Sequence, residues 1–345
     1  MTYTEVLENA RPEMGKFCKA CPVCNGKACG NQMPGPGAKG SGDGAIRNFQ
    51  KWQEIRVVMD TLCENKPVDT SVQLFGKQFT LPVFAGPVGA VNLHYGTKYD
   101  DLSYNQILVA ACAKAGIAAF TGDGAFENVV IDAAKAIKQA DGIGIPTIKP
   151  WNIEKIREKM NYVKESGCFA VAMDIDAAGL PFLKNCNPPA GSKTVNELKE
   201  IASIAEKPFI VKGVMSVKGA LKAKEAGAAA IIVSNHGGRV LDQCAATAEV
   251  LEEIADAVKN DPHNKMKVLV DGGIRTGVDV FKALALGADG VLICRPFVPA
   301  VFGGAEEGVQ VFVQKIKAEL EDTMAMCGVH SIAEITKDMI FRPSK

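Results

Sequence analysis

The sequence predicts a (β/α)8 barrel. Eight short apolar runs alternate with eight helical segments along most of the chain, and glycine directly follows several of those segments. Apolar runs of this kind suit strands buried on both faces, as parallel strands are. An open, doubly wound sheet is the structural alternative, but eight repeats without a second lobe favour closure into a barrel.

The elements follow in a regular order after a predicted small hairpin at residues 71–80, which turns at Gly76 and Lys77. Gly116, Gly227 and Gly287 stand where helices end, as helix C-cap glycines do. The expected strands cover residues 81–85, 117–121, 145–149, 170–176, 209–212, 230–234, 268–271 and 290–294. The expected helices cover residues 101–115, 126–140, 152–166, 194–206, 216–226, 246–260, 276–286 and 304–326.

The start of the chain differs from the rest. Four cysteines lie between positions 18 and 29, and a run rich in glycine and proline follows at residues 33–42. Such a run cannot form a helix or a central strand, so we expect a loop or linker. The sequence therefore predicts an N-terminal extension over residues 1–44 and a barrel domain over residues 45–345.

Composition excludes several classes of protein. Among 345 residues, 39 Lys and Arg balance 39 Asp and Glu, which argues against a nucleic-acid or anionic membrane partner. No apolar run is long enough to span a membrane, and the first residues lack the apolar segment of a secretory signal. An odd number of cysteines, 11, fits reduced thiols. We expect a cytoplasmic protein.

Polar residues follow the last two predicted strands. Asp271, Gly273 and Arg275 follow one strand, and Cys294 and Arg295 follow the next. In (β/α)8 barrels the chemistry lies at the carboxyl ends of the strands, and phosphate commonly binds after strands seven and eight. Glycine N–H groups and forked arginines suit a phosphate. The alternative is a set of tight turns with surface arginines.

The most specific signal follows the sixth predicted strand, where His236 and Arg239 lie three positions apart. Histidine acts as a general base near neutral pH. Arginine holds a carboxylate by two parallel hydrogen bonds. The alternative reading is a structural histidine in a loop, which the surrounding polar strand ends make less favourable.

The segment Val233-Ser-Asn-His-Gly-Gly-Arg-Val-Leu-Asp242 resembles the active-site motif of the FMN-dependent 2-hydroxy-acid oxidases and dehydrogenases, such as glycolate oxidase, lactate oxidase and mandelate dehydrogenase. Residues 212–214 and 271–288 extend the resemblance. It is strong from about residue 210 to residue 335 and traceable from about residue 41. The cysteine-rich start lies outside it.

The resemblance implies that FMN lies across the barrel mouth and that a 2-hydroxy acid, lactate-like or glycolate-like, is oxidised to the 2-oxo acid. It implies that His236 takes a substrate proton while electrons pass to the flavin. Asp176 would orient the imidazole, Arg239 would bind the substrate carboxylate, and Lys212 would stabilise the charge of reduced flavin. Oxygen or a protein carrier would accept the electrons.

The resemblance also implies the cofactor contacts and the assembly. Gly273, Arg275 and Arg295 would hold the phosphate, and the turn at Pro87 would lie against the flavin ring. Family members are often tetramers or larger, which implies a homo-oligomer. The full set of expected FMN contacts is Pro87, Val88, Gly89, Thr121, Lys212, Ser234, Asp271, Gly273, Arg275, Cys294 and Arg295.

Several positions depart from the family pattern. The family's active-site tyrosine before Asp43 is missing, and its Gln-x-Tyr pattern is replaced by residues 147–149, which end in Lys149. Asp174 stands where the family has Thr, and Cys294 where it has Gly. The loop 179–193 has no arginine for the family's second carboxylate contact. Lys149 is a candidate replacement beside His236 and Arg239; the alternative is a solvated lysine.

The cysteine cluster is a separate signal. Cys18, Cys21, Cys24 and Cys29 lie close enough in sequence to bind an iron–sulfur cluster or zinc, and the alternative is redox-active or structural thiols. The spacing resembles that of ferredoxin-like runs but lacks their three-residue step before the last cysteine and the proline after it. This cluster supports a second functional hypothesis: an FMN reductase or dehydrogenase that exchanges electrons with a carrier. A third hypothesis is a catalytically silent ligand-binding barrel.

Overall fold

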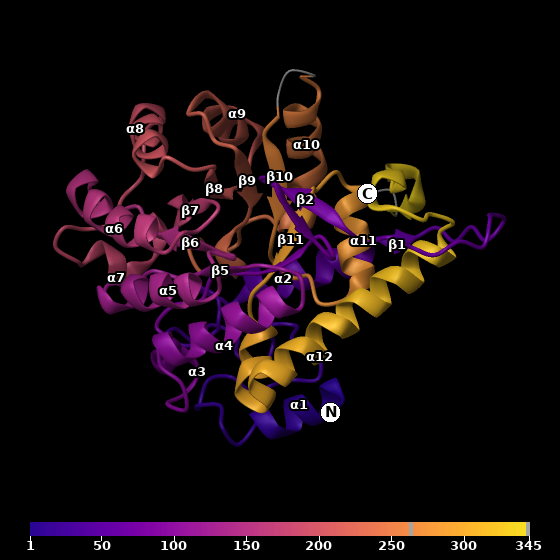
Figure 1. The fold of residues 1–345 in the computed structure, drawn as a ribbon, viewed down its shortest axis with the longest axis horizontal. Helices are drawn as coiled ribbons and strands as arrows, with labels where there is room; N and C mark the ends of the chain where they lie inside the picture. The colour runs from indigo at the N-terminus through magenta and orange to yellow at the C-terminus, as the bar shows by residue number, and fades with distance from the viewer. Residues whose placement is uncertain (262–264, 343–345) are drawn as a thin grey trace.

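The computed structural model describes residues 1–261 and 265–342, and eight parallel strands in it close into a barrel (Figure 1). The first strand of the barrel pairs with its last strand, with Val83 opposite Val291, which confirms the predicted barrel and excludes the open sheet. The barrel strands are β4 (Val83–Ala85), β5 (Ala119–Thr121), β6 (Gly144–Ile148), β7 (Val171–Asp174), β8 (Phe209–Val214), β9 (Ala230–Val233), β10 (Lys267–Val270) and β11 (Gly290–Ile293).

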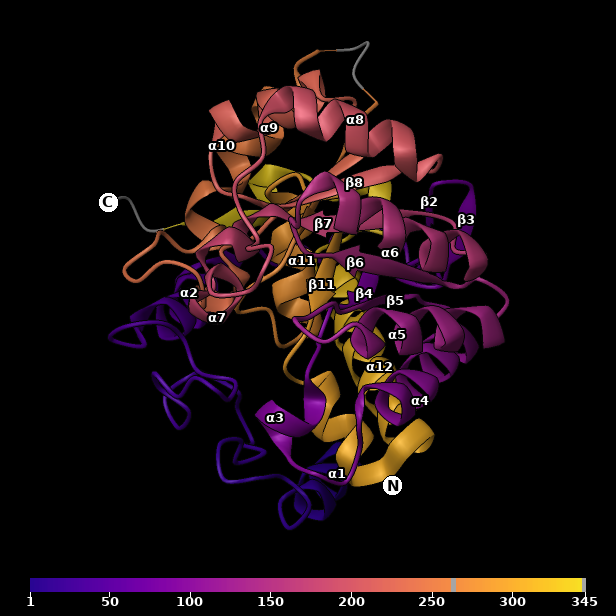
Figure 2. The ribbon, with the colours of Figure 1, turned by 90° about the vertical axis from the view of Figure 1, so that its left-hand side faces the viewer.

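Helices surround the barrel, as Figure 2 shows from a second side. Short polar residues cap several of them: the side chain of Asn152, for example, accepts a hydrogen bond from the N–H of Lys155 at the start of α6. The predicted helices are α4 (Asp101–Lys114), α5 (Asn128–Gln139), α6 (Ile153–Glu165), α8 (Val195–Ala205), α9 (Val217–Glu225), α10 (Thr247–Lys259), α11 (Gly277–Ala285) and α12 (Phe297–Met326).

Helix α12 differs from its prediction, because it begins at Phe297 and not at residue 304. A kink at Ala305, with φ 46°, divides it. The predicted helix matches the part of α12 that follows this kink. Next to the kink, a Cβ atom on Gly303 would lie 1.9 Å from the carbonyl oxygen of Val6. The lack of a side chain at Gly303 lets α1 (Tyr3–Ala10) lie against α12.

The interior of the barrel is apolar at its amino-terminal end. Phe84 and Phe120 fill it, and the hairpin of β2 (Val72–Leu74) and β3 (Lys77–Phe79) closes it from below. Phe79 meets Phe84 edge to face, with ring centroids 5.2 Å apart. The predicted hairpin is confirmed, but its turn lies at Phe75 and Gly76, because Lys77 already pairs with Leu74. Because this end is closed by side chains, only the opposite end offers room for a ligand.

The N-terminal segment packs on the barrel. Helices α1 and α2 (Asp43–Glu54) were not predicted. Trp52 of α2 is fully buried and donates its indole N–H to the carbonyl oxygen of Gly272 at 2.8 Å. The glycine- and proline-rich run contains no helix or strand, as expected, but it crosses the barrel mouth, where the N–H of Lys39 donates to the carbonyl oxygen of Gly238.

The remaining elements are short. Asp176 was expected at the end of a strand, but β7 ends at Asp174 and Asp176 lies in a following 3-10 turn, η1 (Ile175–Gly179).

No helix among the described residues is long and apolar enough to cross a membrane. The others are α3 (Val91–Tyr95), α7 (Pro181–Lys184), the 3-10 turns η2 (His236–Gly238), η3 (Ile332–Glu334) and η4 (Lys337–Met339), and the two-stranded pair of β1 (Arg56–Val57) with β12 (Ile340–Phe341).

Candidate functional site

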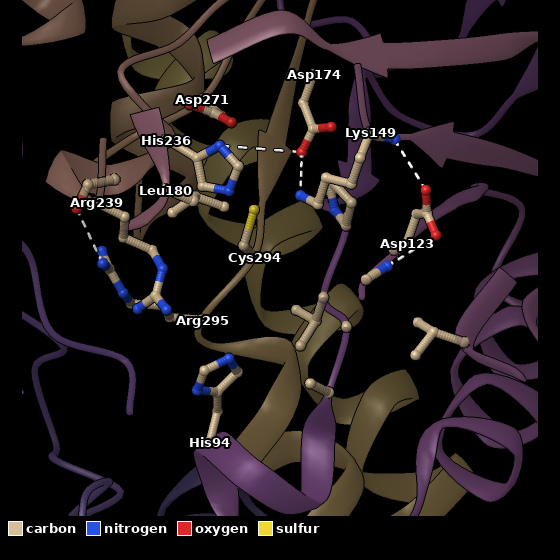
Figure 3. Close-up of a pocket in the computed structure, with 18 of the residues that line it drawn as sticks. His94, Asp123, Lys149, Asp174, Leu180, His236, Arg239, Asp271, Cys294 and Arg295 are labelled. Atoms are coloured by element: carbon tan, nitrogen blue, oxygen red, sulfur yellow. Dashed lines mark hydrogen bonds and ion pairs between the residues drawn. The ribbon is translucent and has the colours of Figure 1, made fainter. Parts of the chain in front are cut away.

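A large cavity opens at the carboxyl ends of the barrel strands (Figure 3). It holds about 1260 Å³ of empty space, counted to its open mouth. Loops from most of the barrel strands contribute to its wall. Of the residues predicted from sequence, it is lined by Pro87, Val88, Gly89, Lys149, Lys212, His236, Arg239, Asp271, Gly273, Arg275, Cys294 and Arg295.

Three predicted residues do not line the cavity. Asp176 lies behind His236, which it contacts. The hydroxyl of Ser234 accepts a hydrogen bond from the backbone N–H of His236 at 3.1 Å and so supports the turn beneath the site. The hydroxyl of Thr121 is fully buried and has no partner among the described residues.

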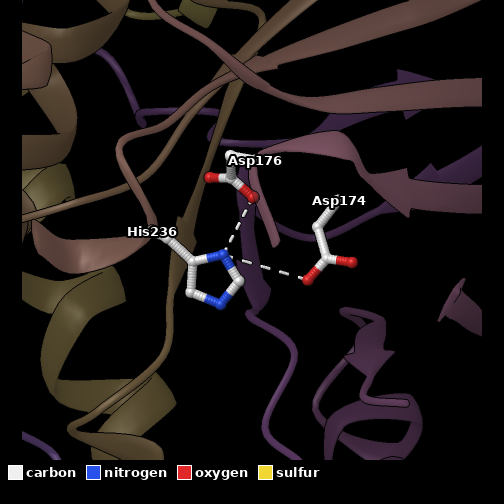
Figure 4. A group of neighbouring side chains, drawn as sticks. All are labelled: Asp174, Asp176 and His236. Atoms are coloured by element: carbon white, nitrogen blue, oxygen red, sulfur yellow. Dashed lines mark hydrogen bonds and ion pairs between the residues drawn. The ribbon is translucent and has the colours of Figure 1, made fainter. Parts of the chain in front are cut away.

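His236 faces two carboxylates (Figure 4). Its Nδ1 atom lies 2.9 Å from Oδ1 of Asp176 and 3.9 Å from Oδ2 of Asp174. A carboxylate at 2.9 Å fixes the tautomer with the proton on Nδ1. Figure 4 shows the other ring nitrogen, Nε2, turned away from both carboxylates. Nε2 is therefore the atom of this ring that is free to accept a proton.

The imidazole of His236 is held in its neutral form. Burial lowers its pKa well below the ordinary value, and the positive charges of Lys212 and Lys149 act in the same direction. The residue has a left-handed backbone, with φ 55°. Such a conformation is costly for a residue other than glycine, and it is concentrated at functional sites.

Lys212 is a buried cation beneath the centre of the cavity. Its Nζ atom lies 3.7 Å from Asp271 Oδ2 and 3.9 Å from Asp176 Oδ2. Burial opposes its charge, but the surrounding carboxylates prevail and raise its pKa above the ordinary value. Both distances exceed hydrogen-bond length, so its ammonium protons remain available for another acceptor.

Lys149 belongs to a buried charge network that the sequence did not reveal. Its Nζ atom donates to Asp174 Oδ2 at 2.6 Å. Its backbone N–H donates to Asp123, which also accepts from the Lys159 ammonium at 2.8 Å and from the Trp151 indole at 2.9 Å. These bonds fix Lys149 in the cavity wall.

The three side chains Asp174, Asp176 and His236 offer ligand atoms within 4.8 Å of one another, close enough for a metal ion. Lys149 and Lys212 already face these carboxylates and offset their charge. A cation here would meet two buried ammonium groups, so we interpret the group as a charge-balanced support for His236.

Three arginines bind backbone carbonyls of the N-terminal segment. Arg239 Nη1 donates to the carbonyl oxygens of Gly35 at 2.6 Å and Gly37 at 2.9 Å. Arg295 Nε donates to the carbonyl of Pro36, and Arg275 Nε to that of Cys24. Burial lowers the pKa of Arg239 to about 10, so it remains charged at neutral pH. Sequence reasoning missed these contacts, since backbone acceptors leave no pattern.

The same region can hold an anion. The backbone N–H groups of Gly272, Gly273 and Ile274 donate to no acceptor among the described residues. Gly272 and Gly273 have φ of 88° and 86°, and consecutive N–H groups in such turns form anion-binding concavities. Arg275 and Arg295 line the same wall. This donor set suits a phosphate.

The outer rim of the cavity is apolar. Leu93, Phe126 and Phe182 line it and remain 51%, 69% and 44% exposed. Sequence reasoning missed them because they lie in loops or short helices, where neither strand nor helix periodicity marks a position. Cys294 is partly buried, and its sulfur occupies the space above Gly86, where a Cβ atom would lie 2.0 Å from it.

A second, smaller cavity adjoins the N-terminal segment. All four of the clustered cysteines line it: Cys18, Cys21, Cys24 and Cys29. Tyr95 and Arg295 line both this cavity and the large one. The two spaces are therefore neighbours.

Comparison with known proteins identifies the family. The family model of the FMN-dependent dehydrogenases matches residues 36–183 and 182–342 of this chain. A peroxisomal (S)-2-hydroxyacid oxidase of Arabidopsis thaliana is 30% identical over 327 residues, which cover 85% of this chain and 86% of that protein. A 2-hydroxyacid oxidase of Dictyostelium discoideum is 28% identical over 337 residues, covering 89% of this chain and 85% of that protein.

Solved structures share the fold. A flavocytochrome b2 variant with sulfite bound superposes with a TM-score of 0.78 at 26% identity, over 88% of this chain and 80% of that chain. A mandelate oxidase variant with (S)-mandelic acid gives a TM-score of 0.79 at 24% identity, over 97% of both chains. FMN carries a phosphate and a polar ring, and the free N–H groups and the arginines of the cavity wall fit such a group.

Proposed function

The chain belongs to the family of FMN-dependent dehydrogenases, and on that premise we propose that it oxidises a 2-hydroxy acid to the 2-oxo acid with His236 as the base. The observation that carries the proposal is the pairing of His236 Nδ1 with Asp176 at 2.9 Å, which leaves Nε2 free in the cavity. The names of its relatives, which are 2-hydroxyacid oxidases, support the substrate class.

His236 accepts one proton from the substrate. Its lowered pKa keeps the imidazole neutral and ready to act before substrate binds. The imidazolium that forms then lies 2.9 Å from Asp176 and 3.9 Å from Asp174, and both carboxylates stabilise its charge. The proton therefore moves to a base that is neutral before substrate binds and is stabilised by the two carboxylates once it is charged.

Arg239 binds the substrate carboxylate. Its Nη1 atom is occupied by Gly35 and Gly37, while Nε and Nη2 have no partner among the described residues. Two free N–H groups on one guanidinium suit a carboxylate. Lys149 lies in the same wall; its bond to Asp174 uses one of three ammonium protons, so it contributes positive charge near the bound acid.

FMN, when bound, supplies the acceptor for the two electrons that leave the substrate α-carbon. With FMN bound, Lys212 would supply buried positive charge to offset negative charge on the reduced ring. Arg275 and Arg295, with the N–H groups at Gly272 and Gly273, would hold the phosphate. The exposed apolar side chains Leu93, Phe126 and Phe182 favour a substrate with an apolar side chain.

Replacing His236 with Ala tests the proposal. We expect the variant to retain FMN, since the proposed phosphate contacts do not involve the His236 side chain, and to lose reduction of the flavin by substrate under anaerobic conditions. His330→Ala, in the segment after α12, is the matched control and should reduce flavin at the normal rate. Undiminished reduction in His236→Ala would overturn the assignment of the base.

A cytoplasmic location and a homo-oligomeric state remain proposals.

A further inference from the structure

The four clustered cysteines are not used by the proposed reaction. They lie in a segment without helix or strand, where the chain turns back on itself around them. Each of the four is a free thiol and is partly buried. Ala20, between the first two cysteines, has the left-handed φ of 43°, as does Gly26, with 83°, between the last two. The backbone is thus curved at both ends of the group.

All four cysteines line one cavity, which holds about 500 Å³ of empty space counted to its opening. Tyr3, Leu7 and Ala20 contribute apolar wall. Thiolates are the ligands of structural zinc and of iron–sulfur clusters, and four of them complete either site. Four thiols that line one cavity thus offer a complete set of protein ligands for a metal centre.

The arrangement of the sulfur atoms bears on which of the two metal centres they suit. A tetrahedral zinc ion at 2.3 Å from each sulfur holds the four sulfurs about 3.8 Å apart. Among the described residues, no three of these cysteines bring their sulfurs within 4.8 Å of one another. A cubane iron–sulfur cluster needs wider spacing, because four iron atoms lie between the thiolates. The first three cysteines also have the C-x2-C-x2-C spacing of cluster ligands.

Positive charge surrounds the cysteine cavity. Arg295 lines it, and Arg275 donates its Nε proton to the carbonyl oxygen of Cys24 at 2.7 Å. A cluster bound by four thiolates is anionic, and cations beside it lower the cost of burying that charge. The arginines that face the phosphate site thus also face the cysteines.

We propose that Cys18, Cys21, Cys24 and Cys29 bind a [4Fe–4S] cluster that carries electrons away from the flavin site. Tyr95 and Arg295 line both cavities, so the cluster lies next to the cofactor. The metal site stands on the cysteines alone; the direction of electron flow rests on the proposed function. The acceptor is a one-electron carrier protein.

The electrons balance. Oxidation of one 2-hydroxy acid to the 2-oxo acid releases two electrons and two protons. The electrons leave the flavin site singly through the cluster, which gains and then loses one electron each time. Two oxidised carriers are reduced for each substrate consumed, and both protons pass to water. Oxygen is not needed.

The first test is the metal content of the full chain purified without oxygen. We expect about four iron atoms and four inorganic sulfides per chain, with broad visible absorption beneath the flavin bands and a paramagnetic signal after reduction by dithionite. Cys24→Ser should lose iron and sulfide, and the matched control Cys63→Ser, at an exposed thiol, should keep both. One zinc per chain, or no metal, would overturn the proposal.

A second measurement separates this proposal from the proposed function and from misfolding. Cys24→Ser should retain FMN and its anaerobic bleaching by substrate, but should lose substrate-dependent reduction of a one-electron protein acceptor. His236→Ala should keep iron and lose bleaching. If Cys24→Ser loses FMN as well, the wild-type chain is stripped of iron by a chelator and rebuilt with iron and sulfide. Carrier reduction that is unaffected by stripping would overturn the electron path.

Discussion

The Nδ1 atom of His236 lies 2.9 Å from the carboxylate of Asp176, and neither residue belongs to a barrel strand. Each lies in a 3-10 turn that follows a strand, so the pairing depends on two loops that meet at the barrel mouth. Lys212, on the strand between them, lies 3.9 Å from the same carboxylate. The three side chains form one electrostatic unit.

Asp176→Asn should leave FMN binding intact and slow flavin reduction by about 10²–10⁴-fold, because the amide no longer fixes the tautomer or stabilises the imidazolium. Asp176→Glu should recover part of the rate. Anaerobic stopped-flow measurement of flavin absorbance gives the rate constant directly. A change in substrate dissociation constant with no change in that rate would contradict this role.

The pH dependence of the reaction should reflect the lowered pKa of His236. The active base is neutral, so kcat/KM stays level as pH falls through 6.5 and decreases only when pH approaches the lowered pKa. Asp174 acts to raise the pKa of His236, so Asp174→Asn should move the acid limb to still lower pH. The test is a pH profile of kcat/KM; an acid limb at 6.5 or above in the wild-type chain argues against the assignment.

Arg239→Lys should weaken substrate binding far more than it slows the chemical step. Lysine cannot hold two loop carbonyls and a carboxylate in one plane, and loss of a buried charged hydrogen bond costs about 2–5 kcal/mol. We expect the dissociation constant of the acid to rise at least about 30-fold, which corresponds to the lower bound of that range. The measurement is a titration of the 2-oxo acid product, which carries the same carboxylate, followed by the change in the flavin spectrum.

Lys159→Met should destabilise the fold by about 3–5 kcal/mol, because it leaves the carboxylate of Asp123 buried without its cation. The side chains are 2% and 0% exposed, so water does not compensate. The double variant Lys159→Met with Asp123→Asn should be more stable than the single variant. Urea unfolding of the two chains decides this; equal stabilities would exclude the ion pair as the cause.

Gly273→Ala should disrupt the turn whose N–H groups are proposed to hold the phosphate of FMN. A Cβ atom there would lie 2.2 Å from the carbonyl oxygen of Asn48, and φ is 86°. Gly227→Ala is the matched control: its φ is 82°, but nothing lies within 4 Å of its Cβ position. The control should cost about 1 kcal/mol from backbone strain alone. FMN content and melting temperature are measured for both variants. Equal losses would show that backbone strain, and not the contact with Asn48, causes the loss in Gly273→Ala.

The sequence determined the barrel and the candidate residues at its mouth. Alternation of buried strands and capped helices is local, so the strand and helix bounds fall within about two residues of expectation, apart from the start of α12. His236, Arg239 and Lys212 follow strands, and parallel strands bring their ends to one face. Residue type and place in the repeat were enough to select them.

Only the tertiary structure decided how those residues are paired. The contact of Arg275 with Cys24 joins positions about 250 apart, and the bond of Lys149 to Asp174 joins the residue after β6 to the end of β7. The close packing of Gly303 in α12 against Val6 in α1 brings together segments from opposite ends of the chain. Such contacts depend on distances in space that no local period encodes. Charge and helix propensity are properties of a segment, whereas the pKa of His236 and the path of the N-terminal run are set by neighbours that folding supplies.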